Sequence, residues 1–193
     1  MARVVRLDQA APVRLRAGGD TVTAWAGTPF DVLATRTVHG ALEPADVTVP
    51  ATGLLTALTV ERADTVDPGM GGLWPGELPP DEGWTPVDDV PAAELERLTE
   101  RGLTVARESA GPHGPPASLL DQTVLTVTGT GAAPAVKVPL RCLFALSGMG
   151  FLGDTGPDAG VVRVSATGAW LRLDARYGAV VRRRLTTLPL LVG

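Results

Sequence analysis

The chain has 193 residues and a mass of 19.9 kDa, a size that suits one domain or two small lobes. Hydrophobic residues make up 45% and charged residues 20%, close to an average globular protein, so the composition excludes wholesale disorder, a collagen-like fibre and a coiled coil. The formal net charge of −4 gives no indication of nucleic-acid binding.

The first forty residues have the composition of β-strands. Val4, Val13 and Val22 lie in short stretches that mix apolar residues with Arg or Thr. The Ala-Gly-Gly-Asp sequence at 17–20 suits a hairpin turn, because glycine accepts a positive φ. The sequence therefore predicts strands near 3–8, 12–17, 20–25 and 31–38.

A helix is expected after Pro50, whose missing N–H is harmless in a first helical turn. Ala51, Leu54 and Leu58 follow at helical spacing. From 64 to 91 the periodicity disappears in a stretch rich in Pro, Gly and acidic residues, which predicts a long loop without a helix or a long strand.

The clearest helical pattern follows this loop. Ala92, Leu95 and Leu98 form an apolar stripe after Pro91, with acidic residues early and Arg late, as the helix dipole favours. Gly102 is expected to end the helix in a left-handed conformation, with 103–107 extended beyond it.

The last third of the chain is expected to alternate between strands and helices. The pattern predicts one helical turn at 117–120, strands at 123–128 and 136–138, and a helix that begins at Pro139 and ends at Gly148 or Gly150. Strands near 162–166, 171–173 and 179–185 then make an antiparallel meander. No internal repeat is visible in the sequence.

Together these elements predict an α+β fold with a mixed or antiparallel sheet, about three short helices, a β-rich N-terminal portion and a C-terminal β-meander. We expect one domain over 1–193. The alternative is a β-rich lobe at 1–63 and an α+β lobe at 92–193, joined by the 64–91 loop.

Motifs for catalysis or cofactor binding are weak. Gly148, Gly150 and Gly153 have the G-x-G-x-x-G spacing, but a helix is expected before them, where a dinucleotide site needs a strand. Cys142 is the only cysteine, which excludes an internal disulfide and a thiolate zinc cage, and its apolar neighbours suggest a buried thiol. We therefore expect no catalytic residue, no metal and no cofactor.

The loop at 64–91 is the strongest candidate for a binding surface. Its two tryptophans, Trp74 and Trp84, are residues that dominate protein interfaces, and its prolines lower the entropy lost on binding. The alternative is a loop that packs its own tryptophans on the core. The candidate binding residues are Trp74, Trp84, Asp81, Glu82, Asp88 and Asp89 around the loop, and Arg163, Arg172 and Arg182 on the meander, all three expected to face outward.

These features favour a non-catalytic protein-binding or adaptor module. A competing hypothesis is a small hydrolase-like enzyme with a carboxylate site under the loop, assisted by His113. A protein partner and self-association, in which the acidic loop meets the basic meander of a second copy, are both compatible with the charge pattern. The sequence lacks a signal peptide and any apolar stretch of ~20 residues, so we expect a cytoplasmic location with neither membrane nor nucleic acid as a partner.

Overall fold

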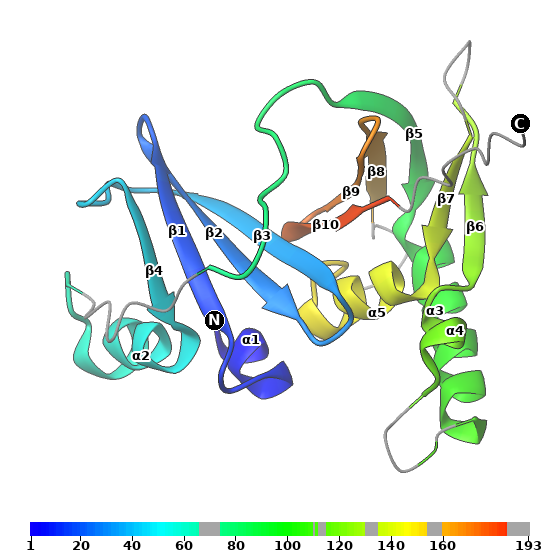
Figure 1. Cartoon of the computed structure of the whole chain (residues 1–193), viewed down its shortest axis with the longest axis horizontal. Helices are drawn as coiled ribbons and strands as arrows, with labels where there is room; N and C mark the ends of the chain where they lie inside the picture. Colours follow the sequence, from blue (N-terminus) through cyan, green and yellow to red (C-terminus); the bar gives the residue numbers. More distant parts are fainter. Residues whose placement is uncertain (66–73, 110, 112–114, 130–134, 154–159, 185–193) are drawn as a thin grey trace, which may run out of the picture.

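The computed structural model describes residues 1–65, 74–109, 111, 115–129, 135–153 and 160–184. Most of its strands form one eight-stranded sheet, and β6 (Thr123–Val127) and β7 (Val136–Pro139) pair separately (Figure 1). The strands of the large sheet are β1 (Pro12–Gly18), β2 (Thr21–Thr28), β3 (Val32–His39), β4 (Asp46–Pro50), β5 (Thr85–Pro91), β8 (Val161–Ala166), β9 (Trp170–Ala175) and β10 (Gly178–Arg183).

The large sheet has the same arrangement when read from either edge. Its order is β4-β1-β2-β3-β10-β9-β8-β5, and every neighbouring pair is antiparallel. Each half is a three-stranded meander with an outer edge strand, and a helix precedes each meander: α1 (Ala2–Leu7) or α5 (Leu140–Met149). The two halves therefore match in spatial order, although β4 follows its meander in the chain and β5 precedes its own, and β3 and β10 lie at the junction.

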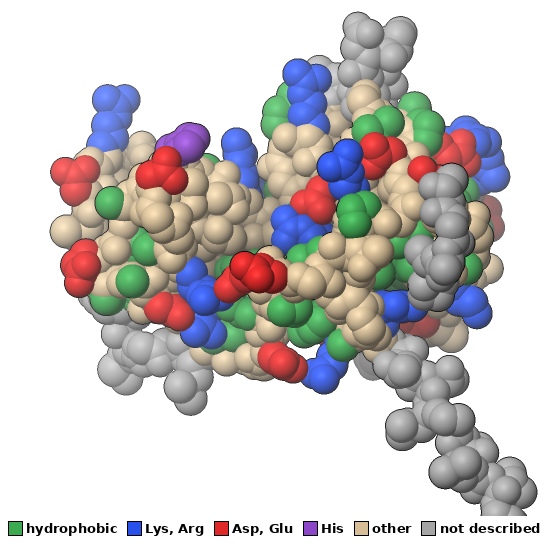
Figure 2. All heavy atoms as spheres, turned by 90° about the horizontal axis from the view of Figure 1, so that it is seen from above, with side chains coloured by type: hydrophobic (Ala, Val, Ile, Leu, Met, Phe, Trp, Pro, Cys, Tyr) green, Lys and Arg blue, Asp and Glu red, His purple; other side chains and the backbone are tan. Residues whose placement is uncertain are grey.

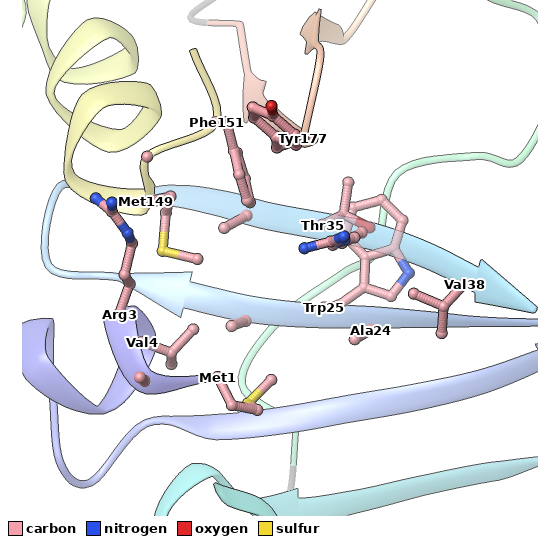
Figure 3. Close-up of a pocket in the computed structure, with 15 residues that line it drawn as sticks. Met1, Arg3, Val4, Ala24, Trp25, Thr35, Val38, Met149, Phe151 and Tyr177 are labelled. Atoms are coloured by element: carbon pink, nitrogen blue, oxygen red, sulfur yellow. The ribbon is translucent and has the colours of Figure 1, made fainter. Parts of the chain in front are cut away.

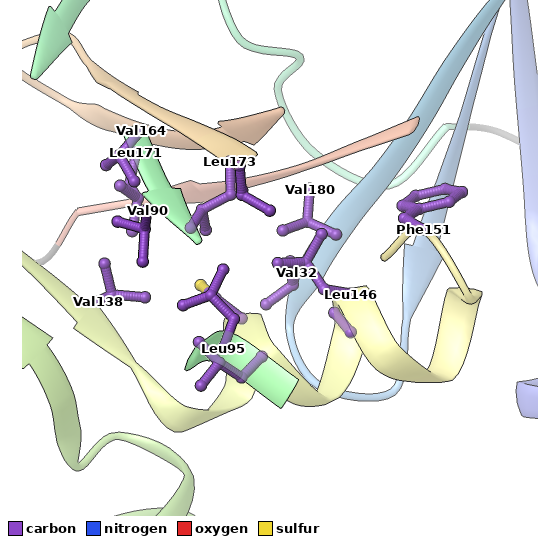
Figure 4. Packing of buried hydrophobic residues seen from close by; sticks show 14 of the residues in the cluster. Val32, Val90, Leu95, Val138, Leu146, Phe151, Val164, Leu171, Leu173 and Val180 are labelled. Atoms are coloured by element: carbon purple, nitrogen blue, oxygen red, sulfur yellow. The ribbon is translucent and has the colours of Figure 1, made fainter. Parts of the chain in front are cut away.

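The helices cover one face of the sheet (Figure 1). Besides α1 and α5 they are α2 (Ala51–Thr56), which continues as a π-helical turn over Ala57–Glu61, α3 (Ala92–Glu108) and the short α4 (Ala117–Leu120). The main core lies between α3, α5 and the C-terminal meander. Figure 4 shows Leu95 and Leu146 of the helices packed near Val164, Leu173 and Val180 of the strands.

One sequence-based assignment near the N-terminus is wrong, and one strand was missed. Residues 2–7 form a helix where a strand was expected, because Val4 is buried in a small second core with Val13 and Val49. This packing outweighs the β-propensity of valine. Strand β4 was not predicted at all, and it forms an edge of the sheet by pairing with β1.

The 64–91 loop and the helix after it also differ from expectation. Residues Thr85–Pro91 form edge strand β5, which tolerates Pro86 beside a bulge in its pairing with β8 and Pro91 at its end. Residues 66–73 lie outside the described part. Helix α3 does not end at Gly102 but runs to Glu108, so 103–107 are helical and not extended.

The predicted fold class is confirmed: an α+β fold with a large antiparallel sheet, a strand-rich N-terminal part and a C-terminal meander. The single-domain prediction and its two-lobe alternative stay predictions. Within the described residues, no helix has both the length and the apolarity that crossing a membrane requires.

Candidate functional site

Residues 74–84, which we call the crossing segment, lie on the face of the sheet opposite the helices (Figure 1). Neighbouring residues of a strand point to opposite faces, so Val180 lies in the main core and Val181 lies under the crossing segment. The buried residues of this outer cluster are Trp25, Trp170 and Val181, and the crossing segment covers them with Trp74, Leu78 and Trp84.

Both predicted tryptophans of the loop are therefore half-buried against the sheet. The indole Nε1 of Trp84 donates a hydrogen bond to the carbonyl of Pro80 at 3.0 Å, and the Arg172 guanidinium lies 5.8 Å from the Trp84 ring centroid. Nε1 of Trp74 is buried and has no hydrogen-bond partner among the described residues. An unpaired buried N–H costs about 1–3 kcal/mol. The polar group of Trp74 therefore does not stabilise the crossing segment, which is held mainly by apolar contact with the sheet.

A crevice of about 290 Å³ opens beside the crossing segment, at the junction of the two halves. The turn between β2 and β3 forms one wall, Pro75–Glu77 form another, and β10 forms the third. Trp170, Val181 and Leu33 give the crevice apolar surface, and Glu77, Arg182 and Arg183 give it charge. The crevice thus combines apolar contact area with charges of both signs.

The acidic residues of the crossing segment lie at the surface. Glu77 pairs with Arg183 at 2.8 Å, and Asp81 lies 3.5 Å from Arg16 of β1. Glu82 is exposed. These pairs join the acidic middle of the sequence to its basic strands, and the view in Figure 2 shows acidic and basic side chains interspersed over this side. Two acidic residues of the crossing segment are therefore paired with arginines of the sheet.

The neighbouring carboxylates Asp81 and Glu82 lie in the crossing segment, whereas the other two neighbouring carboxylates lie in a strand. Asp88 and Asp89 lie on β5, where Asp89 pairs with Arg163 of β8 at 3.1 Å and holds the pKa of that guanidinium above its usual value. The Asp88 carboxylate accepts a hydrogen bond from the backbone N–H of Asp89. No group of three or more His, Cys, Asp or Glu side chains suited to a metal occurs in the described part of the chain, and His113 lies outside it.

Arg182 does not face outward as expected. Only 12% of its side chain is exposed, and it lies 3.0 Å from Asp121 and 3.7 Å from Asp31. Arg141 of α5, 8% exposed, pairs with Asp121 at 2.9 Å and donates a hydrogen bond to the Phe30 carbonyl. Sequence reasoning missed this buried network, although a lone arginine inside the apolar helix was a signal for it.

Arg172 has a different environment. Its guanidinium pairs with Asp174, two residues along β9, at 2.7 Å, and also lies over Trp84. Of the predicted site residues, the structure thus brings Trp74, Trp84 and Arg172 together on the outer face. Arg163 and Asp89 form a separate pair, and Arg182 lies at the edge of the crevice.

Solved structures with a similar fold are DNA polymerase sliding clamps. One from Caulobacter crescentus has a TM-score of 0.57 at 16% identity, over 94% of this chain and 60% of the clamp. One from Pseudomonas aeruginosa has a TM-score of 0.58 at 15% identity, over 98% of this chain and 62% of the clamp. A third, from the same organism and bound to griselimycin, gives 0.58 at 14% identity, over 98% and 62%. The chain therefore shares the clamp fold while spanning about three fifths of the clamp length.

No curated protein matches the sequence. Residues 1–75 match the family model described as Domain of unknown function (DUF8010), and residues 79–187 match a second model. The boundary between the two matches falls within the crossing segment. Because the second match covers more than half of the chain, the protein belongs to the family described as Domain of unknown function (DUF8185).

Proposed function

We propose that the chain is a non-catalytic protein-binding module and that a partner segment docks in the crevice beside the crossing segment. The observation that carries this proposal is the composition of the crevice, in which two chain-distant halves and the Trp-bearing loop meet around apolar surface with charged edges. Protein interfaces concentrate their binding energy in such apolar centres with polar rims.

The packing of the crossing segment supports the same proposal. Nε1 of Trp74 has no hydrogen-bond partner among the described residues, and the ion pairs of Glu77 and Asp81 are exposed, so polar bonds contribute little to holding Pro75–Glu77 in place. A partner that enters the crevice can therefore shift Pro75–Glu77 locally, while still contacting them, at small cost. Trp84 and the carboxylates Asp81 and Glu82 then provide the adjoining contact surface.

The likeness to sliding clamps supports a binding role at the level of the fold. Those structures are sliding clamps of DNA polymerase, and one is bound to griselimycin. The likeness does not support the expectation that nucleic acid is excluded as a partner.

Self-association is a second proposal, favoured by the edges of the sheet. The outer edges of β4 and β5 have no strand partner within the described residues. Exposed edges can pair with a second copy. Sedimentation equilibrium tests this: a mass that stays at 19.9 kDa over the whole concentration range contradicts self-association.

A charge-swap series tests the crevice proposal. Glu77 and Arg183 are both 65% exposed, so Glu77→Arg and Arg183→Glu alter the crevice surface without disturbing the core. The double variant restores the ion pair but reverses the charges that a partner meets. Partners are captured from a lysate of the source organism and quantified by mass spectrometry.

We expect a protein that the unaltered chain captures to be lost with both single variants and with the double variant. The matched control swaps Glu94 and Arg97, an exposed pair on α3, and capture should persist. Capture that returns in the double variant would mean that only the internal ion pair matters, which would contradict docking in the crevice.

A further inference from the structure

A second, larger pocket lies on the helix side of the sheet, where α1 and the C-terminal end of α5 leave part of β2 and β3 uncovered (Figure 3). It has a volume of about 500 Å³, within the range of ligand sites in proteins. Its floor is formed by small side chains, Ala24, Ala26 and Ala34, and Val4 and Phe151 form walls.

The small floor residues explain why the pocket exists. Ala24 and Ala26 are on β2, and Ala34 pairs with Ala26 from β3, so methyl groups occupy the place where larger side chains would fill the gap under the helices. Of the floor residues, Ala26 and Ala34 are buried. The floor of the pocket is therefore built from the sheet itself.

The charges around the pocket have one sign. Arg3 and Arg36 belong to its lining, and none of the lining residues is acidic. Neither arginine forms an ion pair in the part of the chain that the structure describes. Burial and the charge of Arg36 lower the pKa of the Met1 amine, as a positive potential does. Since the chain as a whole has a net charge of −4, this concentration of positive charge is local.

Apolar surface continues to the exposed rim of the pocket. Val38 and Tyr177 line it and are 50% and 42% exposed, so an occupant that extends along the rim covers both. A small molecule that filled only the space between Val4 and Phe151 would leave them in water. This extent favours an extended peptide with one large apolar side chain.

We propose that this helix-side pocket binds an acidic peptide segment of a partner protein. A Phe or Leu side chain enters between Val4 and Phe151, and flanking carboxylates pair with Arg3 and Arg36. The pocket and the crevice lie on opposite faces of the sheet, so this proposal does not depend on the crevice.

Fluorescence anisotropy with defined probes tests the proposal. The probe is a fluorescein-labelled peptide, Gly-Asp-Asp-Phe-Asp-Asp-Gly. One comparison peptide has Ala in place of Phe, and another has Lys in place of every Asp. We expect saturable binding of the first peptide and at least about tenfold weaker binding of the other two, because burial of the ring and charge complementarity are each lost.

Two exposed positions provide the variants. Arg36→Glu and Val38→Asp should each weaken binding of the Phe peptide about tenfold or more, and both side chains are exposed, so folding is retained. Arg6→Glu is the matched control, because Arg6 is an exposed residue of α1 outside the pocket lining and the charge change is the same.

Three outcomes would overturn the proposal. The first is no saturable binding of the Phe peptide, and the second is equal loss of binding with Arg6→Glu and Arg36→Glu. The third is a dimer of the unaltered chain that Arg36→Glu dissociates, since the pocket would then be covered by a second copy. None of these results bears on the crevice, which the Glu77 and Arg183 variants test separately.

Discussion

Gly102 of α3 and Leu140 of α5 pack so closely that a methyl group at position 102 would overlap the Leu140 side chain. Leu140 is 1% exposed and lies in a cluster with Ala106 and Phe144, so it has little room to move. Gly102 is therefore kept in the interior of a helix, against its propensity, because it allows the two helices to approach.

Gly102→Ala should lower the free energy of unfolding by about 1–3 kcal/mol, because the overlap outweighs the gain in helix propensity. Gly53→Ala is the matched control. Gly53 lies in α2 with open space around its Cα, and alanine there should raise stability by about 0.5–1 kcal/mol. Urea unfolding measures both. Equal stabilisation by the two substitutions would show that α3 and α5 are not in close contact.

Asp121 should be far more important for stability than Asp89, although 39% of each side chain is exposed. Asp121 neutralises Arg141 and Arg182, which are 8% and 12% exposed, so Asp121→Ala leaves two buried guanidinium groups without their closest carboxylate. We expect a loss of about 2–4 kcal/mol.

Asp89→Ala is the control, because its partner Arg163 is 60% exposed and stays solvated. Its unfolding midpoint in urea should remain close to that of the unaltered protein. If the two variants have the same midpoint, the Asp121 network is not buried as described.

The tryptophans of the crossing segment should contribute to stability as well as to the surface. Trp74→Ala combined with Trp84→Ala should cost about 2–4 kcal/mol, because both rings are half-buried against Trp25 and Trp170. Val60→Ala, at a position 77% exposed, should have little effect. Thermal unfolding followed by circular dichroism provides the comparison, and an unchanged melting temperature in the double variant would mean that the segment does not pack on the sheet.

Burial raises the pKa of the Cys142 thiol to about 12. At pH 8 the native thiol is therefore neutral and enclosed, and Ellman's reagent should react with it only after unfolding. The unfolded thiol ionises near its ordinary pKa of 9.0. The stabilisation that the neutral, buried thiol gives the folded state is therefore complete below that pH and is lost as the pH rises toward 12. Rapid labelling of the folded protein at pH 8 would contradict this burial.

Local sequence patterns predicted most of the C-terminal half. The helix after Pro139 ends at Gly150, which has a positive φ of 64° as a C-terminal cap, and the three strands of the meander lie where alternation placed them. In these elements local propensity and tertiary packing agree, because the residues that favour a helix or a strand are also the residues that the core buries.

The errors arise where contacts distant in sequence decide the structure. Val4 becomes helical because α1 packs against the second core, and Gly102 stays helical because Leu140 faces it. Neither contact can be inferred from the residues nearby. The same holds for the candidate site: the tryptophans of the loop were identified, but their packing on Trp25 and Trp170, and the crevice beside them, depend on the pairing of β3 with β10.

Hydrogen exchange of the chain with and without its captured partner tests the protein-binding role most directly. Docking in the crevice predicts slower exchange in residues 27–33, 75–77 and 181–183, with no change in the exposed part of α3. Protection confined to surfaces away from these three segments, at partner concentrations that saturate binding, would contradict the proposed site.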